Sequence, residues 1–254
     1  MTYVMSGLHG RWDLYTKMLE KIGFSSEDRL YILGDVVGRD RGGIRILKDI
    51  LERPNVRSLL GEQEHMLLHA VTAPEERAMN GRDMDRRIWY RNGGRAIQAE
   101  WDAQPEPVRR RLLQLIGEMP LNITVEVGGT SFLLCHASPV CMFREYGASY
   151  PDATAFALWH RMEPWMDIRP AADVLIFGHT PTAYYSNSSP MEIFRLKDEV
   201  YAIDCGCADR EDPERRLGCM RLEDRSAIYV GTEDLDGGDG VRPRRMAPDE
   251  TGTI

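Results

Sequence analysis

The side chains of this sequence that are best suited to chemistry lie in five short polar segments. Their ligand-type residues are His9, Asp35, Glu62, His136 and His179. Imidazole nitrogens and carboxylate oxygens in this mixture suit Mn, Fe or Zn. Any one of these residues alone could be a capping or core polar residue. Five of them, each placed just after an apolar run, favour a shared metal site.

The elements around these segments explain how distant residues could meet. Strand, loop and helix alternate three times in the first part of the chain, which predicts an α/β fold with parallel strands. In such sheets, ligands bind outside the carboxyl ends of the strands. The predicted strands are 2–5, 30–33 and 56–60, and the predicted helices are 11–22, 43–51 and 62–71.

The rest of the chain reads differently. Residues from 74 to about 119 are rich in Arg, Glu, Gln and Trp with helical periodicity, which predicts a helical insertion beside the site. A hairpin is expected at 123–134, turning at Gly128-Gly129, followed by a strand at 174–177. Four short strands, typical of a second sheet, are expected at 192–196, 200–203, 218–222 and 227–230. Residues 232–254 have no apolar pattern and predict a disordered tail.

Composition excludes several classes of protein. The length of 254 residues suits one large domain, and no apolar run approaches the ~20 residues of a membrane span. The chain starts without an export signal, so its five cysteines are expected to be reduced thiols in a cytoplasmic protein. Forty acidic against 32 basic residues give a net charge of −8, which argues against general nucleic-acid binding.

The polar segments also match a known set of motifs in order. They read S-G-L-H-G at 6–10, G-D-V-V-G-R-D at 34–40, G-E-Q-E at 61–64, C-H-A at 135–137 and G-H-T at 178–180. The chain resembles the calcineurin-like metallophosphoesterases, specifically the bacterial serine/threonine phosphoprotein-phosphatase-type branch. That branch reads G-D-x-H-G, G-D-x-x-D-R-G, G-N-H-E, H-A or H-G, and G-H-T. The resemblance implies a metallophosphoesterase domain over 1–231. Its fold would be a β-sandwich of two mixed sheets flanked by helices, with a two-metal centre whose activated water attacks phosphorus.

Carried over position by position, the resemblance assigns roles to individual residues. His9 corresponds to a ligand of the first metal, and Asp35 to the carboxylate that bridges both metals. Arg39 corresponds to a phosphate-binding arginine, and Arg161, in the L-W-H-R stretch at 158–161, to a second one. The positions of second-metal ligands are held by Glu62, in place of an asparagine of the family, and by His136 and His179.

Three altered family positions weaken the expected chemistry. Gly7 stands where a first-metal carboxylate is expected. Gly38 and Gln63 stand where the family has the Asp–His pair that protonates the leaving oxygen, and losing a positioned general acid typically lowers the rate ~10²–10⁴-fold. His65 and Asp40 are close enough in sequence to be weighed as substitutes. A helix would turn His65 away from the site, and Asp40 suits a helix cap better.

These observations predict a metal-dependent phosphoesterase of reduced activity that hydrolyses phosphomonoesters or phosphoproteins. Two alternatives stay open: an inactive pseudophosphatase that binds a phosphorylated ligand or protein partner, and a dinucleoside polyphosphate hydrolase. The expected cofactor is one or two divalent ions, with Mn first and Fe or Zn next. Trp159 is interpreted as packing, with the substrate mouth as the alternative. A quadruple variant that restores the family residues is expected to raise Mn-dependent activity by orders of magnitude. Its substitutions are Gly7→Asp, Gly38→Asp, Glu62→Asn and Gln63→His.

Overall fold

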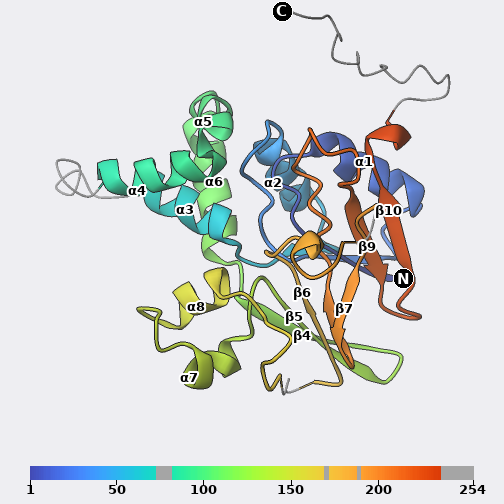
Figure 1. Ribbon diagram of the computed structural model, residues 1–254. Coiled ribbons are helices and arrows are strands. Elements are labelled where there is room, and N and C mark those ends of the chain that lie inside the picture. Colours follow the sequence, from blue (N-terminus) through green and yellow to red (C-terminus); the bar gives the residue numbers. More distant parts are fainter. Residues whose placement is uncertain (73–81, 169–171, 188–189, 236–254) are drawn as a thin grey trace, which may run out of the picture.

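Two five-stranded sheets pack face to face in the computed structural model, and helices cover their outer faces (Figure 1). The structure describes residues 1–72, 82–168, 172–187 and 190–235. The layer between the sheets is apolar: Val4 and Tyr31 of one sheet share a cluster with Phe132 and Ile176 of the other. This arrangement confirms the predicted α/β sandwich of two mixed sheets flanked by helices.

The first sheet has the strand order β10-β9-β1-β2-β3, with β1, β2 and β3 parallel. Its side chains alternate between the two faces. Val4 and Tyr31 face the second sheet, whereas Met5 and Ile32 face the helices. The strands are β1 (Thr2–Met5), β2 (Arg29–Ile32), β3 (Val56–Ser58), β9 (Leu217–Arg221) and β10 (Ala227–Val230).

The second sheet has the order β4-β5-β6-β8-β7, with β5, β6 and β8 parallel. The predicted hairpin is β4-β5, and its turn uses Gly128 and Gly129 at φ of 58° and 83°, as a tight hairpin turn requires. The strands are β4 (Asn122–Val127), β5 (Thr130–Cys135), β6 (Val174–Phe177), β7 (Phe194–Lys197) and β8 (Val200–Ala202).

Two strands expected in the second sheet belong to the first. The predicted strands 218–222 and 227–230 are β9 and β10, and β9 pairs antiparallel with β1, placing Cys219 opposite Met5. Alternation of apolar residues tells which side of a strand is buried, but the two sheets of a sandwich offer equivalent edges. The sequence pattern therefore located the strands and misassigned their sheet.

Helices flank both sheets. Those on the first sheet are α1 (Trp12–Lys21), α2 (Gly43–Glu52) and α3 (Glu62–Thr72). Beside α3, at the left of Figure 1, lie α4 (Arg82–Trp89), the short π-helix η2 (Tyr90–Gly94), α5 (Arg95–Asp102) and α6 (Glu106–Gly117). The second sheet carries α7 (Phe143–Tyr146) and α8 (Ala153–Trp159). The predicted insertion is thus helical over 82–102 and 106–117, and its start at 74–81 lies outside the described residues.

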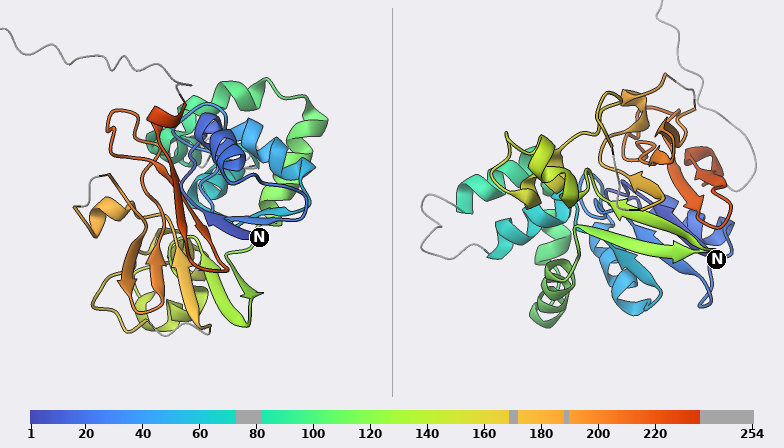
Figure 2. Two further views of the ribbon diagram at one scale, coloured as in Figure 1. Left: turned by 90° about the vertical axis from the view of Figure 1, so that its right-hand side faces the viewer. Right: turned by 90° about the horizontal axis from the view of Figure 1, so that it is seen from below.

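The end of the described chain lies against α1. The first residues of the predicted tail form a short 3₁₀ turn, η5 (Thr232–Asp234), where Asp234 accepts a hydrogen bond from Lys21 Nζ at 3.1 Å. Residues 236–254 lie outside the described part (Figure 2). Among the described residues, no helix is both long and apolar enough to cross a bilayer. All five cysteines are free thiols.

Candidate metal centre

The parallel strands of both sheets end at one place, and a polar side chain follows each end. His9, Asp35 and Glu62 follow β1, β2 and β3, and His136 and His179 follow β5 and β6. The ligand atoms of Asp35, Glu62, His136 and His179 all lie within 4.8 Å of one another. His9 Nε2 lies 3.4 Å from Asp35 Oδ2. The structure therefore brings together the five ligand-type residues expected from the sequence.

Three of these residues have a left-handed backbone. The φ angles are +43° at His9, +53° at Asp35 and +63° at His179. Non-glycine residues seldom adopt this conformation, at a cost of about 1–3 kcal/mol each where they do, and such strain gathers at functional sites. Hydrogen bonds between the loops hold it: His9 N–H donates to the Asp35 carbonyl at 2.7 Å and Gly10 N–H to the Val36 carbonyl at 2.8 Å.

Glu62 is the centre of the charge pattern. One of its oxygens, Oε2, lies within hydrogen-bonding distance of His136 Nε2 and 3.0 Å from His179 Nδ1. Burial acts to raise the pKa of Glu62, but the two imidazoles outweigh it and hold that pKa well below its usual range. His136 Nδ1 lies 2.6 Å from the Leu33 carbonyl, which can only accept. His136 therefore carries its proton on Nδ1 and turns Nε2 toward the cluster, as ligating histidines do.

Asp35 is fully buried at the middle of the site. Its Oδ1 accepts a hydrogen bond from the Gln63 backbone N–H at 3.1 Å, and His136 Nε2 lies 3.7 Å from the same oxygen. Burial and the neighbouring carboxylates of Glu62 and Glu64 raise the pKa of Asp35 well above its usual range. A group of buried carboxylates that repel one another is stabilised by a nearby cation.

Glu64 holds the two central loops together, a role that the motif comparison missed. Its oxygens accept hydrogen bonds from the backbone N–H groups of Asp35, Val37 and Gly61 at 2.8, 2.9 and 3.1 Å. The side chain is 0% exposed, and burial raises its pKa. The sequence signal was the second glutamate of the G-E-Q-E segment, but its type alone did not distinguish a metal ligand from a loop clamp.

The donor set fits a divalent metal. Two imidazoles and two carboxylates meet at the ligand cluster, with His9 next to them, and this mixture is the one that binds Mn, Fe or Zn. Burial is also the main cause that lowers the pKa of His9 to about 4, so its imidazole is neutral at neutral pH. Its Nδ1 is buried without a hydrogen-bond partner among the described residues.

The altered positions are tightly enclosed. Gly7 has φ of +66°, and a Cβ there would lie 2.6 Å from Asp204 Oδ1; Gly38 has φ of +137°, and a Cβ there would lie 2.8 Å from His9 Nδ1. The fourfold reversion is therefore obstructed at both glycines with the present backbone. At Gln63 and Glu62 the side chains already point into the site, and Gln63 Oε1 has no hydrogen-bond partner among the described residues.

The two residues weighed as substitutes lie elsewhere. His65 pairs with His69, one turn further along α3, with the Nε2 atoms 3.1 Å apart. Asp40 forms an ion pair with Arg210. Asp40 is also not the expected helix cap, because α2 begins after Gly42, whose N–H bonds to Glu100 Oε2 at 3.1 Å. Neither side chain replaces the Asp–His pair.

A cavity of about 790 Å³ opens onto the cluster. Glu62, Gln63 and His179 line it. Its walls include both predicted phosphate-binding residues, Arg39 and Arg161, and two arginines that sequence reasoning missed. The further wall residues are Arg91 and Asn92 of η2, Trp159, Tyr184 and Arg215. Trp159 lines this cavity, as the alternative interpretation expected, and also packs against the apolar core, as the first interpretation predicted.

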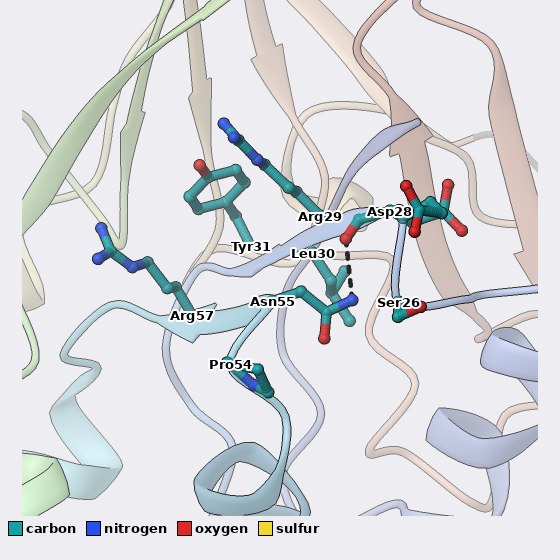
Figure 3. Close-up of a pocket in the computed structure, with 9 residues that line it drawn as sticks. Ser26, Asp28, Arg29, Leu30, Tyr31, Pro54, Asn55 and Arg57 are labelled. Carbon is teal, nitrogen blue, oxygen red and sulfur yellow. Dashed lines mark hydrogen bonds between the residues drawn. The ribbon is translucent and has the colours of Figure 1, made fainter.

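A second hollow, of about 540 Å³, lies at the opposite end of the first sheet (Figure 3). It surrounds the start of β2 and the loop before β3, where Asn55 Nδ2 donates to the Asp28 carbonyl at 2.8 Å. Arg29, Tyr31 and Arg57 line it. The metal-type cluster found among the described residues adjoins the first cavity and not this one.

Comparisons with known proteins agree with the fold. No family model matches the chain. Symmetrical bis(5′-nucleosyl)-tetraphosphatases of Enterobacter sp. (strain 638) and Citrobacter koseri are each 23% identical to it over 291 residues, covering 94% of this chain and 98% of the relative.

Solved structures give the same result. The crystal structure of a candidate diadenosine tetraphosphatase has a TM-score of 0.58 at 15% identity, covering 91% of this chain and 92% of that one. A serine/threonine phosphatase from Saccharomyces cerevisiae has a TM-score of 0.54 at 12% identity, covering 91% and 78%. A metallophosphoesterase from Sphaerobacter thermophilus has 0.50 at 16% identity, covering 91% and 87%. The chain therefore has the metallophosphoesterase fold.

Proposed function

We propose that this protein is a metal-dependent phosphohydrolase whose centre is the strand-end cluster. The observation that carries the proposal is the cluster of Asp35, Glu62, His136 and His179, of which Glu62 and His179 line a cavity that is also lined by arginines. Mn is the first candidate metal, with Fe or Zn next. A divalent ion held there would supply an activated water for attack on phosphorus and would offset charge on the phosphate oxygens.

The chain's own residues supply binding and orientation. Arg39 and Arg161 lie on the cavity wall, and their forked donors suit phosphate oxygens. The Arg161 guanidinium lies 5.2 Å from the Tyr184 ring centre, which restricts its position. Gln63 can donate a hydrogen bond to a leaving oxygen but cannot transfer a proton with a useful pKa. The proposed activity is therefore slow.

The cavity favours a substrate with several phosphates. Four arginines line it, and a polyphosphate bridge carries negative charge along its length, whereas a phosphoserine presents a single phosphate. Trp159 and Tyr184 add flat aromatic faces on which a nucleobase can stack. The two enzymes named as bis(5′-nucleosyl)-tetraphosphatases support the same class. We therefore favour dinucleoside polyphosphates over phosphoproteins and simple phosphomonoesters.

A second candidate is binding without turnover. It is favoured by the absence of the Asp–His pair at Gly38 and Gln63, where the structure offers neither His65 nor Asp40 as a replacement. In this case the arginines would hold a phosphorylated ligand or a phosphorylated partner protein that stays intact.

The test compares substrates side by side with Mn added. Diadenosine tetraphosphate, p-nitrophenyl phosphate and a phosphoserine peptide are incubated with wild type and Arg91→Ala, and binding is measured in parallel by calorimetry. We expect hydrolysis of the tetraphosphate to be fastest and to weaken in Arg91→Ala, with p-nitrophenyl phosphate unaffected. Tight binding without hydrolysis would select the second candidate. Neither binding nor hydrolysis of any phosphate compound would refute both.

A further inference from the structure

A buried carboxylate occupies the place of the missing side chain at Gly7. A Cβ at that glycine would lie 2.6 Å from Oδ1 and 2.7 Å from both Cγ and Oδ2 of Asp204. The Asp204 side chain therefore fills the volume into which an aspartate at position 7 would extend. Glycine at position 7 and aspartate at position 204 fit together, and an aspartate at both positions does not.

Asp204 reaches this place from a sixth strand end. It follows β8 (Val200–Ala202), the third of the parallel strands in the second sheet, just as His136 and His179 follow β5 and β6. Parallel strands deliver the residues after their carboxyl ends to one edge. Asp204 thus enters the centre by the same route as the ligand-type residues. The Gly206 N–H bonds to its Oδ1 at 2.9 Å and fixes its orientation.

Among the described residues, no cationic side chain pairs with the Asp204 carboxylate. Asp204 is 2% exposed, and its carboxylate forms no ion pair with any residue that the structure describes. Burying a charged carboxylate without a partner is strongly unfavourable. His9 follows two residues after Gly7, approaches Asp35, and has an Nδ1 without a hydrogen-bond partner among the described residues. A cation between these three side chains would resolve the imbalance.

We propose that Asp204 supplies a carboxylate to the first metal position, together with His9 and Asp35, in place of the carboxylate that Gly7 lacks. The inference rests on the metal-dependent function proposed above. With Asp204 as a ligand, each of two ions would have a donor set of imidazole and carboxylate. One set is His9, Asp35 and Asp204. The other set is Asp35, Glu62, His136 and His179. The loss at position 7 is then a relocation of a ligand rather than its removal.

The experiment counts metal ions in the intact chain. Wild type and variants are dialysed against Mn²⁺, the bound metal is measured by mass spectrometry, and electron paramagnetic resonance detects a spin-coupled Mn pair. Asp204→Asn keeps the shape of the side chain and removes its charge. Asp40→Asn removes a nearby carboxylate that pairs with Arg210 and is the matched control. Circular dichroism of the metal-free proteins checks that each variant folds.

We expect two Mn ions and a coupled signal in wild type and in Asp40→Asn. Asp204→Asn should still bind tightly the ion held by Asp35, Glu62, His136 and His179. Its affinity for the ion at the first metal position should fall about 100-fold or more, and the coupled signal should be lost. A double substitution gives a test by rescue. Asp204→Gly should lose the ion at the first metal position. Adding Gly7→Asp to that chain should restore the ion, because the Cβ of the new aspartate no longer meets the Asp204 side chain. Aspartate also tolerates a φ near +66° better than most residues.

Two results would overturn the inference. One is a single bound Mn in wild type, and the other is two equally tight ions in Asp204→Asn. Hydrolysis is scored separately in the same samples. If Asp204→Asn loses an ion and no sample hydrolyses phosphate compounds, Asp204 is a ligand and the proposed hydrolysis is wrong. If Mn-dependent hydrolysis occurs while Asp204→Asn keeps both ions and its rate, the hydrolysis stands and the role of Asp204 is wrong.

Discussion

Glu64→Gln should destabilise the protein although it changes a single atom. The carboxylate receives three backbone N–H groups, from Asp35, Val37 and Gly61. A glutamine has one accepting oxygen and one NH₂ group, so at least one buried N–H is left facing a donor. Leaving such a group unsatisfied costs about 1–3 kcal/mol. At about 2–4 °C per kcal/mol for a chain of this size, the midpoint of thermal unfolding should fall by about 2–12 °C.

The assay is thermal denaturation of the metal-free protein at alkaline pH, where Glu64 is ionised. Glu100→Gln is the matched control, because Glu100 accepts a single backbone hydrogen bond, from Gly42 at 3.1 Å, and glutamine can still accept it. The control should melt close to wild type. Mn affinity should also fall in Glu64→Gln, because the clamp positions Asp35 and the loop before α3. Equal melting temperatures for Glu64→Gln and Glu100→Gln would refute the clamp.

Three further results are expected. Lowering the pH from 6.5 to about 4 should cost wild type about 3 kcal/mol more metal-free stability than it costs His9→Gln, because burial lowers the pKa of His9 to about 4 and the unfolded chain takes up the proton first; urea denaturation of both proteins checks this, and equal losses would contradict it. Mn affinity should rise with pH, because burial and neighbouring carboxylates raise the pKa of Asp35 and its proton must leave before metal binds; calorimetry at several pH values tests it, and a flat profile would contradict it. Gln63→His should raise the Mn-dependent rate by about 10²-fold or more, because imidazole can protonate the leaving oxygen; steady-state kinetics measure it, and an unchanged rate would show that position 63 does not face that oxygen.

The ligand-type residues could be predicted because their positions follow from periodicity. Each apolar run of strand length ends shortly before one of them, and parallel strands bring their carboxyl ends together, so His9, Asp35 and His136 meet although they are far apart in sequence. The same rule did not identify Asp204. Asp204 follows a strand as well, but the sequence alone offers no sign of how close its side chain lies to Gly7.

The parts that could not be predicted depend on packing between distant elements. Arg91 reaches the cavity because η2 brings the insertion over the site, and Arg215 because the loop after β8 folds back. No periodicity distinguishes such arginines from those on a solvated surface. The assignment of β9 and β10 to the wrong sheet has a similar origin, since strand pairing across some two hundred residues leaves no local pattern.

The most direct test of the central claim measures Mn binding and diadenosine tetraphosphate hydrolysis in one titration, for wild type and Asp35→Asn. The substitution keeps the size of the side chain and removes the charge at the middle of the cluster. We predict that the wild-type rate rises with Mn occupancy and saturates with it, and that Asp35→Asn loses both. A rate that does not depend on Mn, or one that is the same in Asp35→Asn, would contradict the claim that this cluster is the catalytic metal centre.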